Sequence, residues 1–213
     1  VTVTKGMNRM DLDNFDVVVM PRGWYSLNEN QMNELSSWVN DGGQLIAIGG
    51  ACRTFADKEG WGLSRKGDDI DEGMREDEYD AHSKSDRFAP FALDTRMSIM
   101  DDIPGAVYKI ELDNTHPLAY GYGDHYLSIK TSAQRYAPLN NGGNVGVLSG
   151  SAEPFSGFSG ARANRALDNS LSFGAHSMCG GNAIYLVDNV LFRAFWKNGH
   201  QIFGNAVFFG PAM

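Results

Sequence analysis

The chain has 213 residues, a formal net charge of −8 at neutral pH and two cysteines. This acidic balance disfavours a nucleic-acid-binding surface, which needs clustered basic side chains to neutralise phosphates. No apolar run approaches the ~20 residues of a membrane-spanning helix, so we expect no membrane-spanning segment. Two cysteines are too few for a disulfide framework. Glycine makes up 25 of the 213 residues, well above the average of about 7%, which indicates many tight connections.

The clearest pattern predicts a strand, a helix and a second strand near the N-terminus. Phe15–Met20 is a β-branched run typical of a strand buried on both faces. A capping box of Ser26 and Glu29 predicts the start of a helix, and Gly42-Gly43 predicts its end. Gln44–Gly49 is the second predicted strand. Together they predict a βαβ unit, and hence a parallel pair of strands with a right-handed crossover.

A change of composition follows the second predicted strand. Gly50–Ala56 is predicted to form the first turns of another helix. The next 31 residues, 57–87, contain eleven acidic and six basic side chains, a net charge of −5. We expect this acidic insertion at about 57–87 to be exposed.

The second half of the chain predicts mostly strands and turns. The expected strands are Ala106–Leu112, Tyr126–Thr131, Val145–Leu148, Leu171–Met178 and Ala183–Val187. The last two flank Cys179-Gly-Gly-Asn182, which is typical of a hairpin. A final helix is expected from about Gly199 to Phe209. No internal repeat or linker divides the sequence, so we predict a single domain over residues 1–213.

The turn after the second predicted strand is where flavodoxin-like hydrolases carry a nucleophile. Gly50–Thr54 resembles a G-x-C-x-G elbow without its last glycine, which makes Cys52 a candidate nucleophile. The apolar pattern favours a second register, in which Gly49 occupies the elbow and Cys52 is a small core side chain. A cysteine nucleophile also needs a base, and His176 and His200 are the candidates. The preferred expectation is that this domain has no catalytic residue.

Metal and nucleotide sites have little support. An EF-hand beginning at Asp68 fails because Ile70 and Tyr79 stand where carboxylates are required. The HExxH, GxGxxG and GxxxxGK[ST] patterns are absent. We therefore expect no metal and no cofactor in this domain.

Open α/β sheets bind ligands beyond the carboxyl ends of their parallel strands. The residues that follow the two predicted parallel strands are therefore candidates for holding a carboxylate or a ring. These candidate ligand-binding residues are Arg22, Trp24, Tyr25, Gly49, Gly50 and Arg53.

Several phrases of the sequence together resemble one family. They are Phe15–Pro21, Leu35–Gly49, Phe55–Lys58, Ile103–Ala106, Thr115–Tyr122, Asp188–Trp196 and Phe203–Gly210. In the same order, they resemble the class I glutamine amidotransferase-like domain that follows the catalytic domain in bacterial zinc carboxypeptidases. The resemblance covers most of the chain and is weakest over residues 57–87.

The resemblance implies an α/β fold, a three-layer flavodoxin-like sheet with β-rich additions in the second half. It implies a non-catalytic accessory domain that packs on or assists an upstream peptidase domain, which would hold the zinc, in a secreted or periplasmic protein. The chain would then be a C-terminal fragment, with Val1–Thr4 as the remnant of a sheet strand. The amidotransferase triad is not carried over, because Gly49 stands at the elbow and no matching H-x-E is present. Two alternatives are an independent cysteine hydrolase or amidotransferase using Cys52, and a small-ligand or sugar-binding module.

Overall fold

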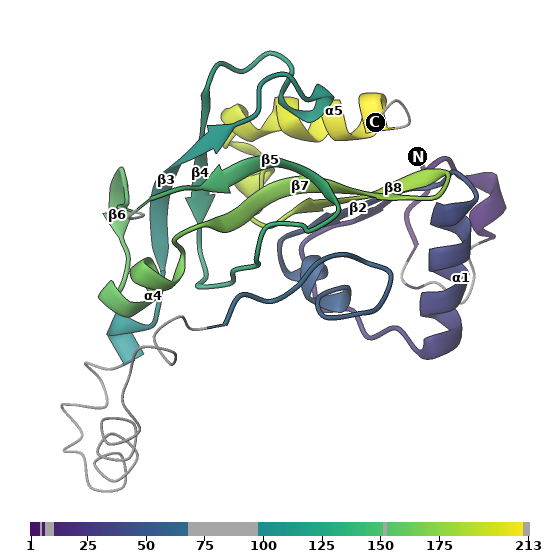
Figure 1. Ribbon diagram of the computed structural model, residues 1–213, viewed down its shortest axis with the longest axis horizontal. Helices are drawn as coiled ribbons and strands as arrows, with labels where there is room; N and C mark the ends of the chain where they lie inside the picture. Colours follow the sequence, from purple (N-terminus) through teal and green to yellow (C-terminus); the bar gives the residue numbers. More distant parts are fainter. Residues whose placement is uncertain (5, 7–10, 68–97, 151–152, 211–213) are drawn as a thin grey trace, which may run out of the picture.

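The computed structural model describes residues 1–4, 6, 11–67, 98–150 and 153–210. Eight strands in these residues form one mixed sheet in the order β1-β2-β8-β7-β5-β3-β4, with β6 paired to β3 outside that order (Figure 1). The strands are β1 (Val17–Met20), β2 (Gln44–Ile48), β3 (Gly105–Leu112), β4 (His125–Lys130), β5 (Gly142–Leu148), β6 (Ser156–Phe158), β7 (Ser170–Met178) and β8 (Gly181–Leu186).

The helices of the described residues are short. The α-helices are α1 (Glu29–Asn40), α4 (Ala161–Ala166) and α5 (His200–Phe209). The 3₁₀ helices are η2 (Leu12–Asn14), η3 (Gly49–Thr54), η4 (Pro117–Ala119), η5 (Phe192–Ala194) and η6 (Lys197–Gly199). None of the helices within these ranges is long and apolar enough to span a bilayer.

The sheet has a parallel half and an antiparallel half. Strands β1, β2 and β8 run parallel to one another, whereas β8, β7, β5, β3 and β4 are joined by antiparallel pairings. The β1-α1-β2 unit and the β7-β8 hairpin, which turns at Cys179-Gly180, confirm two predictions from the sequence. The fold is therefore α/β, with the parallel strands gathered at one end of the sheet.

Alternate side chains of the central strands point to opposite faces of the sheet and belong to two separate hydrophobic cores. Leu45 and Ala47 of β2 pack in one core with α1 and η3. Ile46 and Ile48 face the other core, which holds Ile202 of α5. Helices α1 and α5 therefore cover opposite faces of the parallel strands (Figure 1).

The sheet is strongly curled. In a flat sheet, β4 would lie about 19 Å from β8, because three strands separate them and neighbouring strands are about 4.8 Å apart. Instead, Ser128 and Lys130 of β4 contact Asp188, which follows β8. Curling brings the antiparallel edge of the sheet back over the ends of the parallel strands.

The start of α1 differs from the prediction. The capping box consists of Asn28 and Gln31, whose side chains each accept a hydrogen bond of 2.9 Å from the other's backbone N–H. The expected box at Ser26 and Glu29 is wrong by two residues. With Asn28 as the cap, Leu27 stands directly before the cap and Met32 at the fourth helical position. Both side chains pack against the same core.

Three other expectations are corrected. Gly50–Ala56 does not begin an α-helix, because the chain forms the 3₁₀ helix η3 there. Val1–Thr4 is exposed and belongs to no strand. Within the segment expected to be exposed, Trp61 and Leu63 are each only 1% exposed and belong to the core on the α1 face. Residues 68–87 of that segment lie outside the described residues.

The capping register gives a testable difference between two neighbouring substitutions. Asn28→Ala removes the side chain that accepts from the first turn of α1, so we expect the free energy of unfolding to fall by about 1 kcal/mol. Ser26→Ala, the matched control, is expected to change it by less than about 0.5 kcal/mol. Urea unfolding followed by circular dichroism measures both. The reverse order of the two effects would contradict the assigned cap.

Candidate functional site

A cavity of about 260 Å³ lies beyond the carboxyl ends of β1, β2 and β8. Its walls come from the segments that follow these three strands, from the end of β4 and from the connection after β4. The lining residues are Arg22, Gly23, Trp24, Gly49, Gly50, Arg53, Ile129, Thr131, Ser132, Gln134, Val187, Asp188 and Asn189. This is the place where open α/β sheets usually bind ligands.

A second cavity of about 560 Å³ adjoins the first. The two share Trp24, Gly50, Arg53 and Gln134. We call the two cavities together the edge cleft.

The structure brings all six sequence-predicted ligand-binding residues to the edge cleft. The first cavity holds Arg22, Trp24, Gly49, Gly50 and Arg53, and the second holds Tyr25. The hydroxyl of Tyr25 donates a hydrogen bond of 2.8 Å to the backbone carbonyl of Pro21.

Two glycines allow the backbone to form the wall of the cleft. Gly49 has a φ of +57°, a left-handed conformation that side chains other than glycine rarely adopt. A Cβ on Gly50 would lie 2.8 Å from the carbonyl oxygen of Gly23, closer than real side chains approach. The turn after β1 can therefore pack directly on the start of η3.

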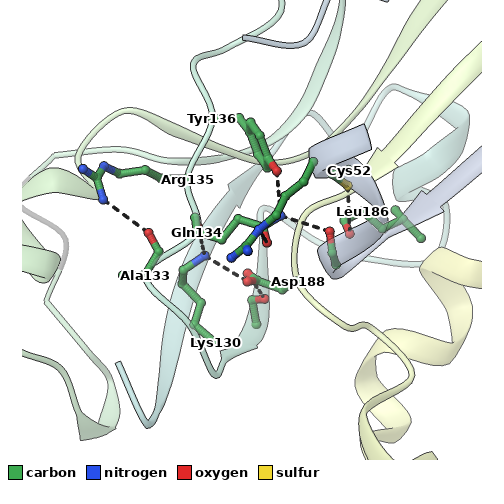
Figure 2. Close-up of polar contacts among 11 residues, drawn as sticks. Cys52, Lys130, Ala133, Gln134, Arg135, Tyr136, Leu186 and Asp188 are labelled. Carbon is green, nitrogen blue, oxygen red and sulfur yellow. Dashed lines mark hydrogen bonds and ion pairs between the residues drawn. The ribbon is translucent and has the colours of Figure 1, made fainter. Parts of the chain in front are cut away.

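Arg53 is held in place at two points. Its Nε donates a hydrogen bond of 3.0 Å to Gln134 Oε1, and its Cζ lies 4.5 Å from the ring centroid of Trp24. Gln134 Nε2 in turn donates to the carbonyl of Gly49 at 3.0 Å and to the hydroxyl of Tyr136 at 2.8 Å. Gln134, seen beside Tyr136 in Figure 2, therefore fixes Arg53 relative to the turn after β2.

A buried ion pair lies against the same cleft. Lys130 Nζ is 2.9 Å from Asp188 Oδ1, and the two side chains are 2% and 7% exposed (Figure 2). Ser128 Oγ donates to the other oxygen of Asp188 at 2.8 Å, and Lys130 Nζ also donates to the carbonyl of Gln134 at 3.2 Å. Both charges are thus compensated, and the loop that carries Gln134 is tied to them.

Cys52 is a core residue in this arrangement. Its side chain is fully buried, and its Sγ donates to the carbonyls of Ala47, at 3.4 Å, and Leu186, at 3.8 Å. Burial, reinforced by the negative charge of Asp188, raises the pKa of the Cys52 thiol far above its ordinary value. The thiolate needed for nucleophilic attack is therefore disfavoured at neutral pH.

The two candidate bases lie in other parts of the fold. His176 is on β7, with its Nδ1 3.0 Å from the carbonyl oxygen of Asn141. His200 is the first residue of α5, which packs on the face of the sheet opposite to the core that contains Cys52. Among the described residues, no three His, Cys, Asp or Glu side chains are grouped as metal ligands would be.

The sequence prediction missed Lys130, Gln134 and Asp188. Asp188 follows the apolar run of β8, so the rule that identified Arg22 and Arg53 could have found it once β8 was known to be parallel to β2. Lys130 and Gln134 come from an antiparallel edge strand and its loop. Their place at the cleft depends on the curl of the sheet, for which the sequence has no local signal.

Comparisons with known proteins identify the type of fold. No family model and no curated protein match the sequence. A ThuA-like protein from Parabacteroides merdae ATCC 43184 superposes with a TM-score of 0.54 at 12% identity, over 95% of this chain and 72% of that one. A ThuA-like protein from Bacteroides uniformis ATCC 8492 gives a TM-score of 0.48 at 10% identity, over 92% of this chain and 69% of that one.

A further match is part of a much longer enzyme. The β-galactosidase from Rahnella sp. R3 matches with a TM-score of 0.47 at 13% identity, and 92% of this chain covers 23% of that protein.

ThuA-like proteins have class I glutamine amidotransferase-like folds, so the Parabacteroides structure supports this type of fold for the present chain. At such low identity the likeness concerns the fold alone.

Proposed function

We propose that this chain is a non-catalytic, amidotransferase-like domain that binds a small polar ligand in the edge cleft. The observation that carries the proposal is the residue at the elbow. The position directly after β2, where a nucleophile would stand, is Gly49 in a left-handed conformation. Glycine offers no side chain for nucleophilic attack, although Gly49 itself lines the edge cleft.

Cys52 does not replace the missing nucleophile in this proposal. Its thiol lies in the core between the backbone carbonyls of Ala47 in β2 and Leu186 in β8, and burial raises its pKa. Thiolate formation there would place a charge in the core without a free cationic partner among the described residues around it, since Lys130 is paired with Asp188. This arrangement favours binding over covalent catalysis.

The cleft has the properties of a ligand site. Its larger cavity, of about 560 Å³, lies within the range of about 300–1,000 Å³ that is usual for small-molecule pockets. It combines an exposed aromatic ring, Trp24, with guanidinium and amide groups. A sugar or another small polar molecule with a flat face would find both kinds of contact there.

A finer part of the proposal is an accessory role beside a zinc carboxypeptidase domain in a secreted or periplasmic protein, with a flavodoxin-like arrangement of layers. Its support is the sequence resemblance, together with α1 and α5 lying on opposite faces of the parallel strands. Reading the coding sequence upstream of Val1 tests it. A His-x-x-Glu zinc signature with a later histidine is expected, and an initiator methionine directly before Val1 would contradict it.

The non-catalytic assignment predicts the reactivity of the two thiols. In the native protein we expect a thiol reagent to label the exposed Cys179 quickly and the buried Cys52 only after unfolding. Incubation with L-glutamine should release no ammonia above the rate of a Cys52→Ala control. Rapid native labelling of Cys52, with ammonia release that Cys52→Ala abolishes, would overturn the assignment.

The binding assignment predicts that filling the cleft abolishes binding. We expect at least one of D-glucose, D-glucuronate and D-glucose 6-phosphate to bind the wild-type chain and to shift the indole NMR signal of Trp24. Ser132→Trp places a bulky ring in the first cavity and should weaken binding at least about tenfold, a loss of about 1.4 kcal/mol. Ser149→Trp, at an exposed position outside the cleft, is the matched control. Binding that survives Ser132→Trp would contradict the proposal, and so would the failure of all three sugars to bind.

A further inference from the structure

We infer that the ligand of the edge cleft carries an oxyanion, either a carboxylate or a phosphate, and that Arg53 and Arg22 bind it. This inference rests on the proposed function, because it names the chemistry of the ligand for the same cleft.

The charge of the cleft is opposite to that of the chain. Among the residues that the structure describes, five basic side chains line it, namely Arg22, Arg53, Arg65, Lys66 and Arg135, against one acidic side chain, Asp188. The chain as a whole has a formal net charge of −8.

Two acidic side chains of the described residues pair with basic groups at or behind the cleft, and neither of them pairs with Arg22 or Arg53. Asp188 is already paired with Lys130, a buried residue that does not itself line the cleft. Asp57 compensates Arg65, at 3.5 Å, but both side chains are solvent-exposed, so the attraction is weak. A concave surface with several guanidinium groups, set in an acidic chain, attracts small anions selectively.

Arg53 is pre-organised to bind an oxyanion. Its Nε donates a hydrogen bond to Gln134, and its guanidinium group lies over the ring of Trp24. The side chain is therefore held in one orientation before any ligand binds. The two terminal nitrogens have no hydrogen-bond or ion-pair partner among the described residues. These nitrogens form the fork that matches two oxygens of a carboxylate or phosphate. Because the orientation is already fixed, binding loses less side-chain entropy.

Arg22 supplies a second guanidinium at the same cavity. Its stem lies over the glycine at the elbow, with Cγ 3.3 Å from the place that a Cβ on Gly49 would take. Within the part of the chain that the structure describes, the Arg22 side chain has no hydrogen-bond or ion-pair partner. A Cβ at the elbow would be in tight contact with this stem, which would have to move by a few tenths of an ångström. The glycine at the elbow thus lets the Arg22 stem lie directly against the turn.

Isothermal titration of the whole chain with three related probes tests the inference. D-glucuronate carries a carboxylate, D-glucose 6-phosphate carries a phosphate, and D-glucose carries neither. We expect at least one of the two anions to bind at least about tenfold more tightly than D-glucose, as one charge-assisted hydrogen-bonded pair would give. The tighter of the two anions identifies the source of the oxyanion.

Three variants locate the anion. Arg53→Gln and Arg53→Lys should each weaken anion binding at least about tenfold, the second because an ammonium group keeps the charge but lacks the fork. Lys109→Gln removes one positive charge from an exposed position on β3, away from the cleft, and should change the affinity less than about twofold. Circular dichroism establishes that each variant is folded.

The outcomes separate the inference from the proposed function. Binding of D-glucose that equals anion binding and is lost in Ser132→Trp would overturn the inference and leave the proposed function standing. Anion binding that is unchanged in both Arg53 variants would also overturn the inference. If none of the three probes binds, both the inference and the proposed function are contradicted.

Discussion

The buried contact between Lys130 and Asp188 is the constraint on which the shape of the molecule depends. Lys130 lies in β4 and Asp188 follows β8, two strands that would lie about 19 Å apart in a flat sheet. The charged atoms of the two residues are nevertheless 2.9 Å apart. The pair joins the antiparallel edge of the sheet to the end of the parallel strands and closes the curl. Ser128 satisfies the second carboxylate oxygen, so neither partner is left as a costly isolated charge in the interior.

The cleft is built outward from this pair. Lys130 also donates to the carbonyl of Gln134, and the side chain of Gln134 holds both the turn at Gly49 and the guanidinium of Arg53. Arg53 then lies over Trp24 at the rim. A continuous series of contacts therefore runs from the core to the exposed ring. This series explains how the turn at Gly49 presents an ordered guanidinium group to the cleft.

Local patterns predicted the parts of the fold whose information is local. The β1-α1-β2 unit and the β7-β8 hairpin follow from apolar runs and glycine turns, and the rule that parallel strands bind ligands at their carboxyl ends placed Arg22 and Arg53 at one cleft. The cap at Ser26 was wrong because two overlapping capping boxes exist in the sequence and apolar packing selects the later one. Long-range contacts had no such signal. Lys130 in an alternating edge strand resembles any exposed lysine, and Trp61 in a charged stretch does not reveal that it packs in the core.

The free energy of unfolding of variants at the buried pair tests the account most directly. Lys130→Met or Asp188→Leu leaves one charge buried without its partner, and each should cost about 3–5 kcal/mol in urea unfolding. The double variant leaves no unpaired charge and is predicted to be more stable than the sum of the two single effects requires, by at least about 1 kcal/mol. Single substitutions that each cost less than about 1 kcal/mol, with additive effects in the double variant, would contradict the claim that this pair holds the sheet and its cleft together.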